Sequence, residues 1–132
     1  MITRTVIATS KGPSAIGPYS QAIRAGNMIF VSGQIPLDPA SDRLIGDLSV
    51  TAQARQCLEN LKGILEGARA SMGDVVKVTI YLTDMNDFKD VNAVYGTYFQ
   101  TDPPARATVQ VAGLPLGVAV EMDCIAVVEE DR

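Results

Sequence analysis

An arginine that follows two prolines is the residue in this sequence best suited to bind an anion. Pro103 and Pro104 fix their φ angles and lack backbone N–H donors, so no helix or central strand continues through them. A strand is expected to begin at Arg106, because polar and apolar residues alternate from there, with Thr108 and Gln110 on the side of the arginine. A guanidinium held on rigid backbone can bind a planar anion through two parallel hydrogen bonds. The other interpretation is an exposed edge-strand arginine paired with a nearby carboxylate.

Glu121 is the carboxylate that the sequence pattern associates with this arginine. Glu121 and Asp123 alternate with apolar residues in the last strand-like segment, so both are expected on one face of that strand. If the two strands are neighbours, Glu121 and Arg106 could lie close together on one polar face. Glu121 would then position a water molecule while Arg106 anchors a carboxylate. The alternative is an interstrand salt bridge, which contributes little when it is exposed.

Four other polar or small residues have a structural interpretation beside a functional one. Tyr19 ends a stiff loop with two Gly-Pro pairs, and it either anchors that loop or turns its hydroxyl toward a ligand. Ser32 and Gly33 most simply end a hairpin, and a serine without a histidine partner is a poor nucleophile. Asn92 is expected on a helix surface, where solvation is the usual role of asparagine.

Composition narrows the chemistry further. The chain has 132 residues, of which 47% are hydrophobic and 20% charged, as expected for one domain covering residues 1–132. Histidine is absent, which excludes histidine-based triads, histidine metal sites and the commonest general base. We therefore expect neither a metal nor a cofactor. The two cysteines, Cys57 and Cys124, are expected to be buried thiols rather than a disulfide.

Charge and hydropathy indicate the surroundings in which the protein works. The net charge is −4 and the basic residues stand singly along the chain, which argues against a nucleic-acid partner. No apolar run approaches the roughly 20 residues of a membrane span, and the first residues lack the apolar segment of a signal peptide. We therefore expect a cytoplasmic protein that is not associated with a membrane.

Periodicity predicts a mixed order of strands and helices. We expect strands at 3–8, 20–25 and 28–32, a surface loop at 37–47, a helix at 49–72 ended by Gly73, a strand at 75–83, a shorter helix that begins at Asn86 or Asp87, and strands from Arg106 and at 118–128. The core side is expected to include Val76, Val78, Ile80 and Leu82 on the strand and Phe88, Val91, Val94 or Tyr95, and Tyr98 or Phe99 on the shorter helix.

This order predicts an α+β fold, in which a six-stranded mixed sheet carries two helices on one face. The opposite face would carry a mixture of polar and apolar side chains, namely Thr79, Tyr81, Thr108, Gln110, Ile125 and Val127. Such a face is too apolar for open water and too polar for a core, so we expect it to form a subunit interface.

Several segments together resemble the reactive intermediate deaminase (RidA) family, over essentially the whole chain and without a large insertion. They are Gly17–Ala22, Gly26–Pro36, Gln53–Gln56, Asn60-Leu61, Gly73–Lys77, Asp87-Phe88, Val91-Asn92, Pro104–Arg106 and Leu114-Pro115. The Gly-Gln-Ile-Pro and Pro-Ala-Arg segments at this separation are the most specific part. The resemblance implies a chorismate-mutase-like fold and a homotrimer with three clefts between subunits.

The resemblance also implies an activity, the hydrolysis of reactive 2-imino acids or their enamine tautomers, such as 2-iminobutanoate and 2-iminopropanoate, to 2-keto acids and ammonia. By resemblance Arg106 holds the substrate carboxylate and Glu121 is associated with activating water. Tyr19, Ser32, Gly33 and Asn92 match residues that line or support the cleft. Thr108 stands where many members have a cysteine. The threonine removes the redox and covalent sensitivity that a thiol would have at this position. It does not remove the implied deaminase activity.

Two other functions remain open from the residues. A trimeric module that binds a small carboxylate without converting it would use the same arginine. A ribonuclease activity, reported for some relatives, is disfavoured by the acidic charge and the missing histidine.

Overall fold

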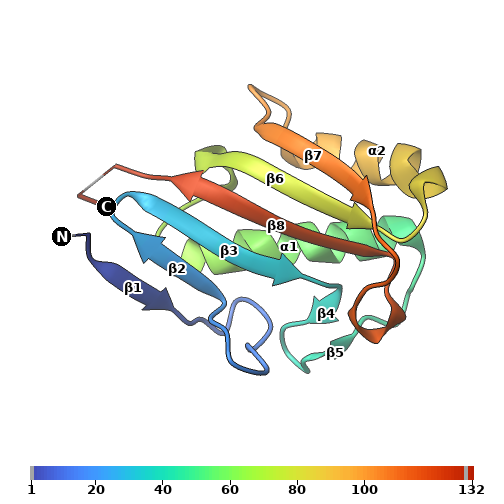
Figure 1. Ribbon diagram of the computed structural model, residues 1–132, viewed down its shortest axis with the longest axis horizontal. Helices are drawn as coiled ribbons and strands as arrows, with labels where there is room; N and C mark the ends of the chain where they lie inside the picture. The colour runs from blue at the N-terminus through green and yellow to red at the C-terminus, as the bar shows by residue number, and fades with distance from the viewer. Residues whose placement is uncertain (1, 130) are drawn as a thin grey trace.

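Six strands form one mixed sheet, and two α-helices lie behind it in the view of Figure 1. The computed structural model describes residues 2–129 and 131–132. The sheet order is β1-β2-β3-β8-β6-β7, from the strands Arg4–Ile7 (β1), Ala22–Ala25 (β2), Met28–Gln34 (β3), Val75–Leu82 (β6), Ala105–Gln110 (β7) and Val120–Val127 (β8). The β6–β7 pair is parallel and the other pairs are antiparallel. The predicted α+β class and six-stranded mixed sheet are confirmed.

The connections explain why this sheet is mixed. β2 and β3 form the predicted hairpin, in which Gly26 adopts a φ of 62° and Ala25 pairs with Met28. The helix α2 (Phe88–Tyr98) connects β6 to β7, which places those two strands side by side and parallel. The helix α1 (Val50–Gly67) connects β3 to β6, and the last strand, β8, inserts between them. Sequence predicted the crossovers, and the structure adds the place of β8.

The long helix begins as predicted and ends early. Ser49 Oγ accepts a hydrogen bond from the Ala52 N–H at 3.3 Å, which caps α1. The helix ends because Arg69 adopts a left-handed φ of 61°, and the Ala70 N–H then donates to the Leu65 carbonyl at 2.8 Å. The predicted end at Gly73 is therefore wrong. Gly73 belongs to a separate 3-10 helix, η1 (Met72–Asp74).

Three smaller expectations also need correction. The segment predicted as a loop contains a two-stranded hairpin, β4 (Leu37–Asp38) with β5 (Arg43–Leu44). Val76 is 45% exposed rather than buried, because a register shift between Val75 and Lys77 turns Val75 to the core instead. Phe88, the first residue of α2, is 38% exposed rather than buried.

The core lies between the helices and the back of the sheet. It includes Leu58, Leu61 and Leu65 of α1 and the alternate residues Val120, Met122, Cys124 and Ala126 of β8, all buried. Both cysteines are buried and unpaired, as predicted. Burial raises the pKa of the Cys57 thiol well above its ordinary range and that of Cys124 to about 12, so both stay protonated.

Among the described residues, no helix covers the front of the sheet, which carries apolar side chains. Val6, Phe30 and Val109 on this face are 56%, 41% and 41% exposed. The predicted placement of Thr108 and Gln110 here is wrong. Thr108 pairs with the buried Ile80 and therefore faces the helices, while Val109, opposite Tyr81, faces the front.

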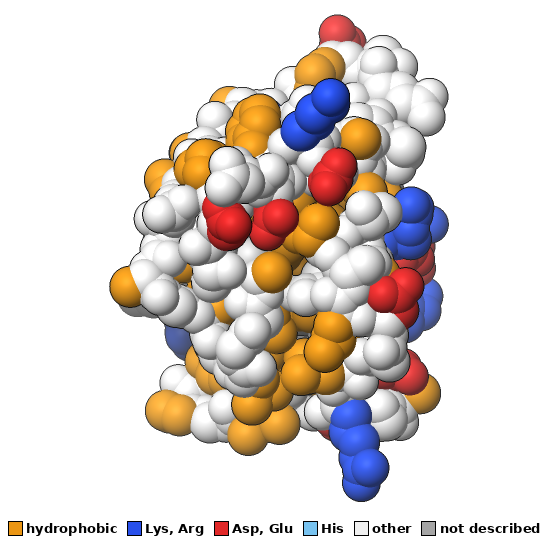
Figure 2. Space-filling view, turned by 90° about the vertical axis from the view of Figure 1, so that its right-hand side faces the viewer, with side chains coloured by type: hydrophobic (Ala, Val, Ile, Leu, Met, Phe, Trp, Pro, Cys, Tyr) orange, Lys and Arg blue, Asp and Glu red, His pale blue; other side chains and the backbone are white. Residues whose placement is uncertain are grey.

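At the end of the molecule drawn in Figure 2, basic side chains stand singly between polar and hydrophobic ones.

Buried side-chain amides hold the loops onto the core. Gln21 Nε2 donates to the carbonyls of Thr9, Gly12 and Pro13, and Gln21 Oε1 accepts from the Thr9 N–H at 2.7 Å. These four bonds satisfy backbone groups that would otherwise be unpaired in a loop with two Gly-Pro pairs.

Two further amides act in the same way from α1. Asn60 Nδ2 donates to the carbonyls of Ile35 and Leu37, at 3.1 and 2.9 Å. Gln53 Oε1 accepts from the Ala119 N–H at 2.8 Å. The three amides together fix the loops around one end of the sheet.

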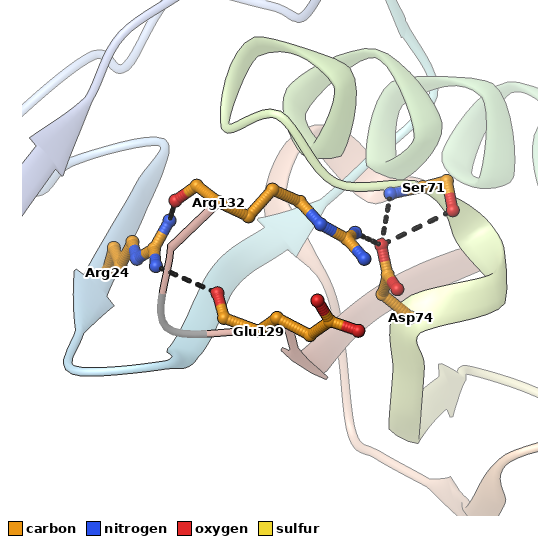
Figure 3. A network of polar contacts seen from close by, with 5 residues as sticks. All are labelled: Arg24, Ser71, Asp74, Glu129 and Arg132. Atoms are coloured by element: carbon orange, nitrogen blue, oxygen red, sulfur yellow. Dashed lines mark hydrogen bonds and ion pairs between the residues drawn. The ribbon is translucent and has the colours of Figure 1, made fainter.

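The C-terminal residues are held beside β2 and η1, as Figure 3 shows. Arg132 Nη1 pairs with Asp74 Oδ2 at 2.6 Å, and the same oxygen accepts from the Ser71 N–H at 2.9 Å. Arg24 donates to the backbone carbonyls of Arg132 and Glu129. These contacts hold Glu129 and Arg132 against two different elements of the fold.

Candidate active site

A cavity of about 480 Å³ brings together four of the residues singled out by the sequence, namely Tyr19, Ser32, Gly33 and Glu121. It lies where β3 and β8 meet the loop before β2 and the loop after β7. Apolar side chains complete its wall, namely Ile16, Ile35, Leu37 and Pro115. A cavity with mostly apolar walls and a few polar groups suits a small organic ligand.

Glu121 lies directly against the backbone of Gly33. A side-chain Cβ at position 33 would overlap Glu121 Oε2, so only glycine leaves room for the carboxylate in this position. The predicted role of Gly33 as the end of a simple hairpin is incomplete, because β3 continues to Gln34 with a register shift between Val31 and Gln34. This irregularity lies where Gly33 contacts Glu121 of β8.

The protein environment of Glu121 stabilises the protonated carboxyl group more than water would. Partial burial raises the pKa of the Glu121 carboxyl above its ordinary value, and the negative charge of Asp123 raises it further. Asp123 Oδ2 itself accepts a hydrogen bond from the Tyr81 hydroxyl at 2.8 Å. A carboxylate with a raised pKa is a stronger base than an ordinary glutamate, which suits proton transfer from water near neutral pH.

Tyr19 and Ser32 both line this cavity. Tyr19 is 50% exposed, and its hydroxyl accepts a hydrogen bond from the Ile16 N–H at 3.3 Å, so it both anchors its loop and reaches the cavity. Ser32 Oγ donates to the Ser20 carbonyl at 2.6 Å. No histidine is present to activate this serine, and its hydroxyl is already engaged, so a nucleophilic role is not supported.

Arg106 belongs to a second group of residues, formed by β7 and α2. Its Nη1 donates to Asn92 Oδ1 at 2.8 Å, and its guanidinium carbon lies over the rings of Phe88 and Tyr95, at 5.5 and 4.8 Å from their centroids. Within the part of the chain that the structure describes, no carboxylate forms an ion pair with Arg106. The alternative interpretation of Arg106 as one half of a salt bridge is therefore not supported.

Thr108 follows Arg106 on the same side of β7. Its Oγ1 atom is buried and has no hydrogen-bond partner among the described residues. A buried hydroxyl without a partner costs free energy, so a ligand or a second protein chain that offers a partner would be favoured there.

The structure separates the two groups that the sequence placed on one face. Arg106 pairs with Val78, a buried residue on the helix side, whereas Glu121 pairs with Tyr81 on the open side. The expectation that both side chains meet on one polar face of a single chain is therefore wrong. Alternation places polar Thr108 and Gln110 away from the core, but the open face of the edge strand β7 is itself apolar, so alternation alone predicts the wrong side.

Sequence reasoning missed three residues that the structure shows at these sites. Gln21 lines the cavity and holds its loop, while Phe88 and Tyr95 contact the Arg106 guanidinium. A signal was present for the last two. Phe88, Asn92 and Tyr95 are spaced four and three residues apart, which puts them on one face of a helix.

A metal centre is not indicated by the side chains. Among the described residues, no group of three or more His, Cys, Asp or Glu side chains could hold a metal ion. No helix in the described ranges is long and apolar enough to cross a membrane.

The fold and the two polar groups define a small α+β protein with an arginine suited to bind an anion and a cavity that contains a carboxylate. Residues 9–128 match the family model described as Endoribonuclease L-PSP, and the chain belongs to that family. The sequence is 52% identical over 126 residues to the mouse 2-iminobutanoate/2-iminopropanoate deaminase, which covers 96% of this chain and 93% of the mouse protein.

Other relatives agree with the resemblance drawn from the sequence. Arabidopsis thaliana Reactive Intermediate Deaminase A, chloroplastic, is 46% identical over 95% of this chain and 66% of its own. The solved structure of E. coli TdcF with bound serine superposes with a TM-score of 0.89 at 44% identity, over 95% of this chain and 99% of that one. Yeast Mmf1 superposes with a TM-score of 0.91 at 42% identity, over 96% and 100%. The expected fold is therefore confirmed.

Proposed function

We propose that this protein hydrolyses 2-imino acids, and the enamines that tautomerise to them, to 2-keto acids and ammonia. The observation that carries the proposal is a partly buried Arg106 without an ion-pair partner among the described residues, held by Asn92 on one side. Such an arginine is a binding site for a carboxylate that the chain itself does not supply. The mouse relative at 52% identity is named for this reaction.

The proposed chemistry needs one water molecule and one base. Arg106 binds the substrate carboxylate, and Glu121 accepts a proton as water adds to C2 of the iminium ion, giving a tetrahedral amino alcohol. The proton then passes from Glu121 to nitrogen. Glu121 takes the hydroxyl proton of the intermediate as the C2–N bond breaks, so that ammonia leaves and the 2-keto acid forms. Positioning accounts for most of the acceleration, while a general base contributes roughly 10²–10⁴-fold. No step requires a cofactor.

The two groups of residues are proposed to meet between subunits of a homotrimer. Arg106 and Glu121 point to opposite faces of the sheet, so one chain does not bring them together. The open face carries exposed apolar side chains, including Phe30 and Val109, as a subunit interface requires. A neighbouring subunit that covers this face would place its own Arg106 beside the Glu121 cavity.

The other singled-out residues have supporting roles in this proposal. Asn92 orients Arg106, Gly33 admits the Glu121 carboxylate, and Tyr19 and Ser32 line the cavity. Thr108 offers its unpartnered hydroxyl beside the substrate.

The decisive experiment generates the imine in the presence of the protein. A threonine dehydratase or an amino-acid oxidase forms the imine from its parent amino acid, and the release of keto acid and ammonia is followed with and without the purified protein. The proposal predicts faster release at catalytic amounts of protein, with several parent amino acids compared to find the preferred side chain. Release that stays at the uncatalysed rate would reject it.

A carboxylate-binding module without catalysis is the second candidate. TdcF was solved with bound serine, an amino acid that carries a carboxylate. The same arginine would serve such a module. Calorimetry that shows binding of a 2-keto acid, together with no acceleration of imine hydrolysis, would favour it over the deaminase.

The name of the matching family model also raises the question of ribonuclease activity. A net charge of −4 and the absence of histidine do not favour cleavage of RNA, because backbone binding uses clustered basic residues. We propose a cytoplasmic enzyme with a small-molecule substrate and neither a nucleic-acid nor a membrane partner. RNA cleavage that persists at constant specific activity through purification would contradict this.

A further inference from the structure

We propose that Phe88 and Tyr95 are positioning residues that hold the Arg106 guanidinium for carboxylate binding. This inference rests on the proposed function, because it assigns Arg106 the same ligand. It adds two aromatic side chains that act on the substrate only through the arginine. We call Phe88, Asn92 and Tyr95 the α2 clamp.

The helix sets the geometry of the α2 clamp. Phe88 and Tyr95 are seven residues apart, about two turns or 10 Å along the helix axis, and Asn92 lies between them on the same face. The guanidinium carbon is 5.5 Å from the Phe88 centroid and 4.8 Å from the Tyr95 centroid, and Nη1 bonds Asn92 at 2.8 Å. The guanidinium therefore lies in the gap between the two rings.

The rings offer an attraction that leaves the arginine charge available. A carboxylate partner would neutralise Arg106 and compete with the substrate, whereas an aromatic face attracts a cation without occupying its N–H donors. Asn92 takes one N–H of the guanidinium. The remaining edge of the planar group stays free for two parallel hydrogen bonds to a carboxylate.

Burial fixes the two rings to different degrees. Tyr95 is only 5% exposed and packs against Phe99, with ring centroids 4.7 Å apart and ring planes tilted by 41°, so its ring is held by the core. Phe88 is 38% exposed, and the Arg106 guanidinium carbon lies 5.5 Å from its ring centroid. Contact with Arg106 gives this exposed ring a role.

The test measures binding of 2-ketobutyrate to the full-length protein by calorimetry, together with deaminase kinetics. Phe88→Leu removes an exposed ring without opening a core cavity, and Tyr95→Leu removes the buried one. Tyr98→Leu is the matched control, because Tyr98 is an aromatic residue of the same helix whose hydroxyl bonds Glu59 instead. Tyr95→Phe keeps the ring, so it should retain the 2-ketobutyrate affinity that Tyr95→Leu loses.

We expect the Kd for 2-ketobutyrate and the KM for the imine to rise by about 3- to 30-fold in Phe88→Leu and Tyr95→Leu, with kcat nearly unchanged. A purely structural role would lower the active fraction and hence kcat, and leave KM as it was. The inference is overturned if both leucine variants bind as wild type does, or if Tyr98→Leu or Tyr95→Phe weakens binding equally.

The same measurements separate this inference from the proposed function. Weaker keto-acid binding in the leucine variants of a protein that does not accelerate imine hydrolysis would reject the deaminase and support the α2 clamp. Normal hydrolysis with unchanged binding in those variants would reject the α2 clamp and support the deaminase. Wild-type protein that binds no 2-keto acid would reject the inference outright.

Discussion

Arg106 and Glu121 face opposite sides of the same sheet, although the strands that carry them are both neighbours of β6. Arg106 lies opposite Val78, whose side chain is buried under the helices, and Glu121 lies opposite Tyr81 on the open side. Side chains of directly paired residues share a face, so this register fixes the Arg106 and Glu121 side chains on opposite faces of the sheet. A site that uses both groups must take them from two chains, and several expectations depend on this separation.

Replacing the arginine should remove recognition of the carboxylate without unfolding the protein. For Arg106→Ala we expect kcat/KM for imine hydrolysis to fall by about 10²–10³-fold, because two charge-assisted hydrogen bonds are lost. Arg106→Lys should recover only part of the activity, since an ammonium group cannot form the same planar pair of bonds. Circular dichroism and gel filtration check that fold and assembly are unchanged. Arg106→Ala that retains full activity would remove the carboxylate site from the mechanism.

The raised pKa of Glu121 predicts where activity is lost on the acid side. A base must be deprotonated, so activity falls as the pH drops through the Glu121 pKa, and the acid limb lies at higher pH than for an ordinary glutamate. Asp123→Asn removes the neighbouring negative charge, which lowers the Glu121 pKa and should move the acid limb of kcat/KM to lower pH. Tyr81→Phe is the control. It removes the hydrogen bond to Asp123 but keeps the charge, so no shift to lower pH is expected.

Gly33 should be required for the position of the Glu121 carboxylate. Gly33→Ala places a methyl group where Glu121 Oε2 lies, so the carboxylate must move, and displacement of about 1 Å can cost up to about 10²-fold in rate. We expect a large fall in kcat, measured in the coupled assay, with folding retained. Gly46→Ala is the matched control, because nothing lies within 4 Å of a Cβ there. Equal activities of the two variants would contradict the assigned contact.

The sequence pattern predicted the strand that carries Arg106 better than it predicted which face of the sheet each side chain occupies. Alternation in 105–110 correctly predicted a strand that begins near Arg106, but it assigned the apolar side to the core. In this sheet the open face is also apolar, including Val109 at 41% exposed, so hydrophobicity could not distinguish the two sides. The pairing register decides the face, and register depends on contacts between strands that are distant in sequence.

Local exceptions account for the other differences. Arg69 adopts the left-handed conformation that ends α1. Glycine is the residue usually found in this conformation, so the sequence pattern predicts that the helix ends at Gly73. Gly73 instead lies in η1. The register shift at Val75 reverses the burial expected for Val76. In contrast, the strands expected at 20–25 and 28–32 and the helix start expected near residue 49 agree with the structure, because local turn and capping chemistry determines them.

Gln21 is expected to stabilise the fold as well as the cavity wall. Gln21→Leu leaves the Thr9 N–H and three loop carbonyls without their partner in a buried place, which should lower the free energy of unfolding by about 2–4 kcal/mol. Urea unfolding measures the change. Gln100→Leu is the control, because Gln100 is exposed and bonds only the nearby Thr97 carbonyl, so a change within about 0.5 kcal/mol is expected. Equal losses in the two variants would show that the Gln21 bonds do not hold the loop.

Mixed oligomers test whether the two halves of the site come from different subunits. Arg106→Ala and Glu121→Gln chains are each expected to be inactive alone, the first for lack of a carboxylate ligand and the second for lack of a base. Unfolding and refolding the two together allows a site to combine Glu121 of an Arg106→Ala chain with Arg106 of a Glu121→Gln chain. Random mixing in a cyclic trimer should restore about one quarter of the wild-type sites. The coupled deaminase assay measures the recovered kcat per subunit, with each variant refolded alone as the control. If both groups served one site from a single chain, mixing would restore nothing, and the separation of Arg106 and Glu121 across the sheet would need another explanation.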